Sequence, residues 1–232
     1  MQYFALLISQ ERERTPEEGA EGMAAFQAFH AKAASAIRAG DALAPTASAV
    51  RITGGPDAPI VTDGPFAESA EVACGYYVFE AENLDEALAL ARDIPAAKHG
   101  AVEVWPMVMW NQPEKPLTGS HWLALLLEPA DNAVAPNSPE WEAGIAAHGQ
   151  FNSAAGDHIK GGAALHPPAT ATTVTVRDGK ATLTDGPFAE GAEVANGFYI
   201  LDAADGDEAV KIASMIPATT VEVRQLMGIS GL

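Results

Sequence analysis

The feature that most constrains this chain is an internal repeat. The segment from Thr62 to Glu68 recurs letter for letter from Thr184 to Glu190, and both copies read Thr-Asp-Gly-Pro-Phe-Ala-Glu. With this offset of 122 residues, 21 of the 35 positions from Thr62 to Ala96 are identical. The 232-residue chain is therefore predicted to be a tandem duplication, with one domain at 1–112 and a second at 119–232, joined by a short polar linker.

Each copy opens with an apolar run that is typical of a buried strand, at 3–8 and at 122–127. A helix is expected next. In the first copy, Thr15 is suited to cap it and Pro16 to occupy its first position. Gly40 is suited to end this helix, which is therefore predicted to run to about Ala39.

A hairpin, a strand, a second helix and a final strand complete each copy, and Asp178-Gly179 is a strong turn signal for the second hairpin. The predicted order is β-α-β-β-β-α-β. This order resembles a ferredoxin-like α+β module, in which helices cover one face of an antiparallel sheet. We therefore predict two tandem modules that form a pseudo-dimer within one chain, with the sheets facing each other and the helices outside.

The repeated Asp-Gly-Pro-Phe motif resembles the DGPF branch of the YCII-related family. The segment 165–174, the aromatic strand after each motif and the Ile-Pro-Ala segments are also similar to that branch. The resemblance implies the dimeric α+β-barrel fold, normally built from two chains. Some relatives are lyases that act on hydroxylated, chlorinated aromatics, with a proposed His–Asp active site. Many DGPF members lie near genes for extracytoplasmic-function sigma factors.

The aspartates of the two motifs, Asp63 and Asp185, are the first candidates for chemistry. A carboxylate at a strand end can act as a general base when an apolar pocket raises its pKa. The structural alternative is that each aspartate accepts backbone N–H bonds and fixes its turn.

Two histidines, one in the first helix of each copy, are the natural partners for these aspartates. In the repeat register His148 matches Phe26 and His30 matches Asn152, so both histidines fall on one helix face. A His–Asp pair is suited to proton transfer near neutral pH. The alternative is that both are ordinary, partly exposed helix histidines.

Three further residues are candidates for substrate binding. His166 lies in the loop before the second hairpin, and Tyr77 and Tyr199 occupy twin positions on the strand after each motif. One member of each pair, Tyr76/Tyr77 and Phe198/Tyr199, should point into the barrel. The alternatives are surface decoration for the histidine and core packing for the tyrosines.

Composition excludes several other classes of function. The net charge of −18 disfavours nucleic acid and anionic membrane as partners. No metal motif, phosphate-binding loop or dinucleotide fingerprint is present, so neither a metal nor a cofactor is expected. The single cysteine, Cys74, excludes an intramolecular disulfide. No signal peptide or membrane span is recognisable, and a cytoplasmic location is expected.

Two hypotheses for function remain open. The first is a cofactor-independent acid–base enzyme, a lyase or isomerase acting on a small cyclic or aromatic molecule. It would pair Asp185 with His148, or Asp63 with His30, at a pocket between or within the modules. The alternative is a non-catalytic module that binds a small ligand or docks to a protein. The sequence leaves open whether the pseudo-dimer pairs again as a homodimer.

Overall fold

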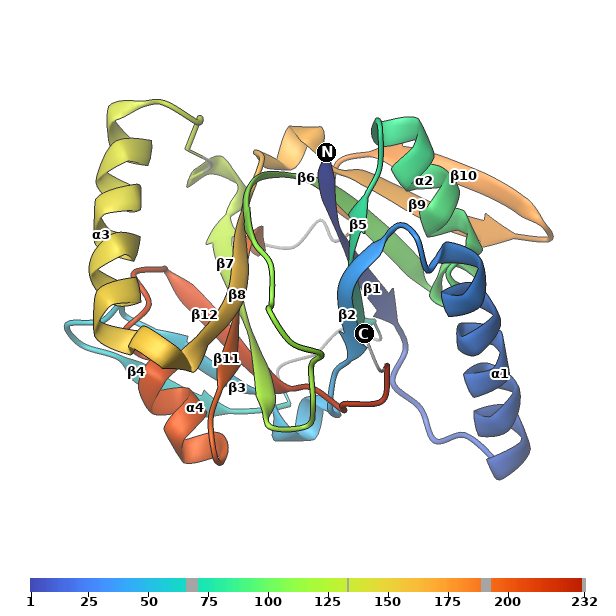
Figure 1. Ribbon diagram of the computed structural model, residues 1–232, viewed down its shortest axis with the longest axis horizontal. Coiled ribbons are helices and arrows are strands. Elements are labelled where there is room, and N and C mark those ends of the chain that lie inside the picture. Colours follow the sequence, from blue (N-terminus) through green and yellow to red (C-terminus); the bar gives the residue numbers. More distant parts are fainter. Residues whose placement is uncertain (66–70, 133, 189–192, 231–232) are drawn as a thin grey trace.

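A computed structural model describes residues 1–65, 71–132, 134–188 and 193–230 and has the predicted α+β fold (Figure 1). The strands of the first copy are β1 (Gln2–Ser9), β2 (Ile37–Ala42), β3 (Val50–Thr53), β4 (Ile60–Asp63), β5 (Val72–Glu80) and β6 (Ala101–Asn111). Those of the second are β7 (His121–Pro129), β8 (Ile159–Leu165), β9 (Thr172–Arg177), β10 (Lys180–Asp185), β11 (Glu193–Asp202) and β12 (Thr220–Gln225). The helices are α1 (Pro16–Ala33), α2 (Leu84–Asp93), α3 (Pro139–Ala155) and α4 (Gly206–Ala213).

Eight strands form the barrel, four from each copy. Their order is β2-β5-β1-β6 in the first copy, continued through the β6–β8 pairing as β8-β11-β7-β12 in the second. The two ends of this path meet where Leu43, just after β2, forms an antiparallel bridge with Leu226, just after β12. At the other seam Met107 lies opposite Leu165, which are the twins of Leu226 and Leu43. The chain thus forms an intrachain pseudo-dimer with two related seams.

The short hairpins are exchanged between the copies. The β3–β4 hairpin of the first copy pairs with β12 of the second, where Ile52 lies opposite Val221. Reciprocally, the β9–β10 hairpin of the second copy pairs with β6 of the first, where Val174 lies opposite Val102. Each copy therefore extends the sheet of the other.

The barrel interior is a shared apolar core. Side chains of both copies meet there, and the rings of Phe4 and Phe198 stack with centroids 4.6 Å apart. Trp105 and Tyr76 are fully buried in the same cluster. Because apolar burial dominates the free energy of folding, this shared core makes each copy depend on the other.

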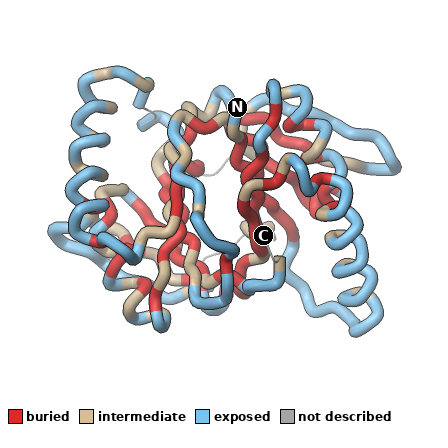
Figure 2. The backbone as a smooth tube through the Cα atoms, in the orientation of Figure 1, coloured by how far each residue is buried: buried red, intermediate tan, exposed pale blue. Residues whose placement is uncertain are grey.

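Two further apolar clusters lie between the sheets and the helices. The cluster beneath α1 and α2 includes Val174 of the exchanged hairpin, and the cluster beneath α3 and α4 includes Ile52. The long helices contribute few buried residues: Phe29 and Ala33 in α1, and their twins Phe151 and Ala155 in α3. Figure 2 shows both helices exposed along most of their length.

The predicted end of the first helix is wrong. Helix α1 begins at the expected Thr15 cap, whose side chain accepts a hydrogen bond from the Glu18 N–H, but it ends at Ala33. Gly40 lies in β2, a strand that the predicted order lacked, and β8 is its twin in the second copy. A side chain at Gly40 would collide with the Tyr77 ring and the Tyr76 carbonyl on the neighbouring strand. The glycine therefore serves close packing between strands rather than helix termination.

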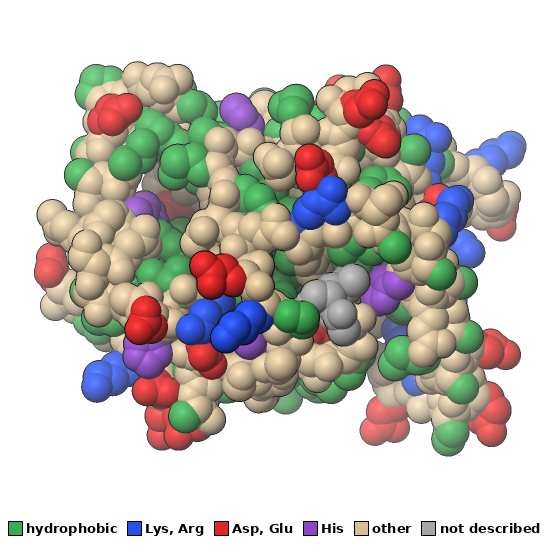
Figure 3. Space-filling view, in the orientation of Figure 1, with side chains coloured by type: hydrophobic (Ala, Val, Ile, Leu, Met, Phe, Trp, Pro, Cys, Tyr) green, Lys and Arg blue, Asp and Glu red, His purple; other side chains and the backbone are tan. Residues whose placement is uncertain are grey.

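The surface reflects the acidic composition. Figure 3 shows acidic side chains gathered around the free end of α1, where Glu17 and Glu21 are exposed. No helix in the described ranges combines the length and apolar character that crossing a membrane requires.

Candidate functional site

The two motif aspartates lie exposed at the outer strands of the exchanged hairpins. Asp63 ends β4 and Asp185 ends β10. Neither carboxylate accepts a hydrogen bond from the described part of the chain. The turns are instead held by backbone bonds, in which the Gly64 N–H donates to Ala49 O at 2.8 Å and the Gly186 N–H to Ala171 O at 2.9 Å. The motif residues 66–68 and 189–190 lie outside the described residues.

His30 forms a hydrogen-bonded pair with a tyrosine of the sheet rather than with a motif aspartate. Its Nε2 lies 2.6 Å from the Tyr77 hydroxyl oxygen, and the two rings meet edge to face. Partial burial lowers the pKa of His30, and the negative charge of Asp41 offsets part of this effect by raising the pKa. Burial, with a smaller contribution from Asp41, raises the pKa of Tyr77 well above its usual range. The pair is therefore neutral near pH 7.

His148 and Tyr199 form the corresponding pair in the second copy. Nδ1 of His148 lies 2.9 Å from the Tyr199 hydroxyl oxygen. Burial lowers the pKa of His148, and the negative charge of Glu128 offsets part of this effect by raising the pKa. Burial raises the pKa of Tyr199 to about 12. Although His30 and His148 sit one helical turn apart in the repeat register, each reaches the tyrosine at the same strand position.

The strand after each motif points one aromatic residue inward and the next outward, as expected. Tyr76 and Phe198 line the barrel interior, whereas Tyr77 and Tyr199 face the helices. The Tyr76 hydroxyl is buried and has no hydrogen-bond partner among the residues that the structure describes. The two tyrosines expected to bind substrate therefore lie between sheet and helix, outside the barrel.

The hairpin exchange separates the histidines from the aspartates of their own copy. Asp63 lies on the sheet of the second copy, whereas His30 lies on α1 of the first. Asp185 lies on the sheet of the first copy, whereas His148 lies on α3 of the second. Figure 1 shows β4 and α1 at opposite ends of the molecule, and likewise β10 and α3. The structure does not bring together the pairs Asp63–His30 and Asp185–His148.

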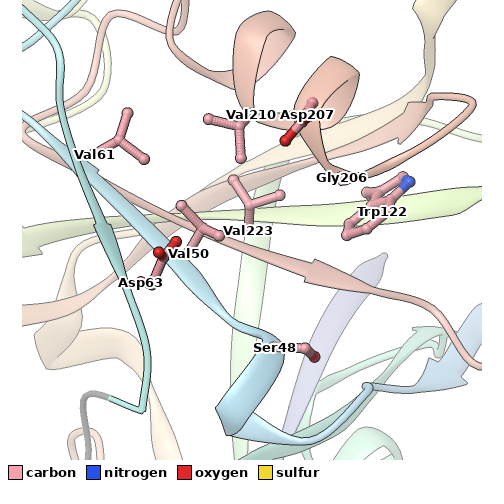
Figure 4. A pocket seen from close by; sticks show the side chains of 9 residues that line it. All are labelled: Ser48, Val50, Val61, Asp63, Trp122, Gly206, Asp207, Val210 and Val223. Carbon is pink, nitrogen blue, oxygen red and sulfur yellow. The ribbon is translucent and has the colours of Figure 1, made fainter.

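Asp63 does line a recess of about 260 Å³ on the outer face of the second copy (Figure 4). The exchanged hairpin forms one wall and α4 the other, with β7 and β12 as the floor. The lining residues are Ser48, Val50, Val61 and Asp63 from the first copy, and Trp122, Gly206, Asp207, Val210 and Val223 from the second. The site is therefore built jointly by both copies.

The residue at the start of α4 distinguishes this recess from its twin position. Gly206 begins α4, whereas the repeat register places Leu84 at the start of α2. Leu84 packs against the apolar cluster of the first copy, while a Cβ on Gly206 would lie 3.4 Å from the Trp122 ring. The missing side chain leaves space beside Trp122. This substitution is visible in the sequence, but its consequence depends on the hairpin brought over it.

Two buried carboxylates were missed by sequence reasoning. Asp41 accepts hydrogen bonds from the Gly228 N–H at 2.6 Å and the Ile229 N–H at 3.3 Å, so it ties the end of the second copy to β2. Glu103 accepts from the Phe188 N–H at 2.8 Å and from the Trp105 indole at 3.0 Å. Glu103, a residue of the first copy, therefore anchors the backbone of the Asp-Gly-Pro-Phe motif of the second copy at Phe188.

The twin of Glu103 makes a cross-copy contact of a different kind. Glu222 lies 3.1 Å from the guanidinium of Arg51, which belongs to the exchanged hairpin of the first copy. The repeated Val-Glu-Val segment is visible in the sequence, but alternation along a strand places each glutamate on the face opposite its valines, and only the tertiary structure shows what it contacts there.

The remaining candidates, His166 and Cys74, lie apart in the sequence. His166 is partly buried, and its backbone N–H donates to Pro106 O at 3.0 Å. Burial raises the pKa of Cys74, which opposes formation of a nucleophilic thiolate. Within the described ranges, no group of three or more His, Cys, Asp and Glu side chains is placed to hold a metal ion. A second recess, of about 220 Å³, is lined by linker residues and by Arg38 and Ala39, and its lining includes none of the candidate residues.

Comparison with known proteins identifies the repeated unit. The family model described as the YCII-related domain matches residues 1–111 and again 122–229. An uncharacterised protein of Rhizobium meliloti (strain 1021) is 40% identical over 76 residues, which amount to 32% of this chain and 61% of that relative. A crystal structure titled as a candidate chlorite dismutase aligns with a TM-score of 0.43 at 7% identity, covering 99% of this chain and 95% of that one.

Proposed function

The chain belongs to the YCII-related domain family as a fused pair of its domains, and we propose that it binds a small molecule in the recess between the β3–β4 hairpin and α4. One observation carries this proposal. The aspartate singled out by the repeated motif lies in a recess whose walls come from both copies (Figure 4).

The composition of the recess suits binding of a compact organic molecule. Val50, Val61, Val210 and Val223 supply apolar walls, and Trp122 supplies an aromatic surface. Small-molecule sites commonly combine apolar walls with a few polar groups that fix orientation. Here Ser48, Asp63 and Asp207 supply those polar groups.

Binding fits this geometry better than acid–base catalysis. A general base must lie within hydrogen-bond reach of the proton that it removes and have a pKa near the working pH. The two carboxylates of the recess are exposed, and none of its nine lining residues is a histidine. The recess can therefore hold and orient a ligand, but its lining residues include no histidine to exchange a proton with the carboxylates.

A fragment screen monitored by amide chemical shifts of the full chain tests the proposal. The library should contain cationic, neutral and anionic compounds of about ten non-hydrogen atoms. We expect binders to shift the amide signals of Val61, Trp122 and Val210. Gly206→Leu should abolish this response, because Gly206 lines the recess and a side chain added there would lie against the Trp122 ring.

Gly149→Leu is the matched control. It adds the same side chain to an exposed helical glycine that has no other group within 4 Å of an added Cβ. This control should bind fragments as the unmodified chain does. A screen in which no fragment response depends on residue 206 would contradict the proposal.

The His–Tyr pairs support a second candidate, the cofactor-independent acid–base enzyme. Burial keeps His30 and His148 neutral near pH 7, the form in which an imidazole accepts a proton. The test is release of chloride from chlorinated hydroxyaromatics, the substrate class implied by the family resemblance. Turnover that is lost in either His30→Asn or His148→Phe supports the enzyme, and turnover unchanged in both contradicts it. Both replacements use the residue found at the twin position.

A further inference from the structure

The charge of the recess restricts which small molecules it accepts. Asp63 approaches from the hairpin and Asp207 from the first turn of α4, with valine side chains between them (Figure 4). None of the nine lining residues is basic, and Lys211, four positions after Asp207, is not among them. The whole chain carries a net charge of −18. Both the recess and the surrounding field therefore favour a cation over an anion.

The apolar side chains in the walls of the recess favour an organic cation over a metal ion. Metal ions such as Ca²⁺ take six to eight oxygen ligands, whereas the acidic groups here are two carboxylates on opposite walls. The valines would contribute nothing to a metal ion, but they can bury the hydrocarbon part of an amine. The Trp122 ring adds a surface to which an ammonium group is attracted.

We infer that the ligand of this recess is a small organic amine, with its ammonium group attracted by the carboxylates of Asp63 and Asp207 and its apolar body against the valines and Trp122. This inference rests on the proposed function and names the chemical class that the site accepts. The inference is made for the recess beside Gly206, since the twin position carries Leu84, which packs against the apolar cluster of the first copy.

Three probes of nearly equal shape separate charge from size. Benzylamine carries a positive charge at neutral pH, benzyl alcohol is neutral and benzoate is negative. Their affinities for the full-length chain should be measured by titration of the Val61, Trp122 and Val210 amide signals. We expect benzylamine to bind at least several-fold more tightly than benzyl alcohol and benzoate to bind most weakly. Added salt should weaken the binding of benzylamine.

The internal repeat supplies matched controls for each carboxylate. Asp63→Asn and Asp207→Asn should each weaken benzylamine about two- to fivefold, the range expected for exposed ion pairs. Their twins, Asp185→Asn and Asp85→Asn, remove the same charge outside the recess. These controls should leave benzylamine affinity unchanged, apart from the small effect of net charge.

The outcomes separate the inference from the proposed function. If benzyl alcohol or benzoate binds as tightly as benzylamine, or if the twin controls weaken benzylamine as much as Asp63→Asn, the amine inference is overturned. Ligand binding at the recess would still stand where Gly206→Leu abolishes it. If no probe and no library fragment gives a response that depends on residue 206, the proposed function fails with it.

Discussion

At the residue scale, a hydrogen bond between a helix histidine and a strand tyrosine connects helix to sheet in each copy. The His30–Tyr77 and His148–Tyr199 contacts lie beside Phe29 and Phe151, which are among the few buried residues of α1 and α3. With so few apolar anchors, these hydrogen bonds help to set how each helix meets the sheet. A hydrogen bond of this kind contributes about 0.5–1.5 kcal/mol to stability.

The shifted pKa of His148 predicts a pH-dependent stability. In the folded chain, burial lowers this pKa below the value of 6.5 for an unperturbed histidine, to which unfolding returns it. As the pH falls through 6.5, the unfolded state takes up a proton before the folded state does. The free energy of unfolding should therefore decrease as the pH is lowered from about 7 to 5.

Chemical denaturation across this pH range, with His148→Phe as the comparison, measures the effect. Phenylalanine is the twin residue, Phe26, and it does not titrate. The variant should lose less stability between pH 7 and 5 than the unmodified chain. Parallel curves for the two proteins would show that His148 does not carry this dependence.

A second residue-scale prediction concerns the tyrosine hydroxyl. Tyr199→Phe removes the partner of His148 and keeps the ring that packs edge to face against Phe151. We expect a loss of about 1 kcal/mol in the free energy of unfolding, measured by denaturant titration at pH 7. A variant as stable as the parent would mean that the contact adds nothing to stability.

At the element scale, the exchanged hairpins determine which residues meet. They place Ile52 of the first copy beneath α4 of the second, and Val174 of the second in the cluster of the first. Glu103 and Glu222 add polar contacts across the same exchange. The exchange also brings Asp63 into the recess and carries both motif aspartates away from the histidines of their own copies.

Ile52→Ala tests the exchange directly. Removing a buried isoleucine side chain costs about 2–5 kcal/mol. Amide hydrogen exchange should show the loss of protection mainly in β12 and α4, although the mutated residue belongs to the first copy. Val174→Ala is the reciprocal control and should affect β6 and α2. Loss of protection confined to β1 and β5 in the Ile52 variant would contradict the exchanged arrangement.

At the scale of the whole molecule, the two copies form one closed barrel with a common interior. Phe4 of the first copy stacks on Phe198 of the second, and both seams join strands of different copies. Separating the copies would expose the inner apolar face of each sheet and leave each exchanged hairpin without a sheet to pair with. Exposed apolar faces of this kind promote association.

A fragment of residues 1–112 should therefore self-associate or aggregate when produced alone. Light scattering coupled to size-exclusion chromatography would report its mass beside that of the full chain. Mixing it with a 119–232 fragment should recover a heterodimer of full-chain mass. A stable, monomeric first fragment would refute the shared-core interpretation.

Several properties followed from local patterns in the sequence. The repeat predicted two copies of one module, the apolar runs predicted β1 and β7, and Thr15 predicted the start of α1, because each signal depends on neighbouring residues. The helix end predicted at Gly40 was wrong because this glycine is required for another reason. The ring that leaves no room for a side chain there belongs to Tyr77, which is distant in sequence. The candidate site was predictable only in part: Asp63 was named, but Gly206, Asp207 and Trp122 were not.

The sequence by itself determined the duplication, the α+β class and the acidic surface, since repeat identity, periodicity and charge are properties of the chain. Only the tertiary structure decided which copy each hairpin completes and which aromatic faces the interior. The last strand of each copy, β6 or β12, carries the same Val-Glu-Val segment, so local pattern cannot determine which of the two strands a hairpin joins. That choice depends on the closure of the barrel, and it determines which residues surround Asp63.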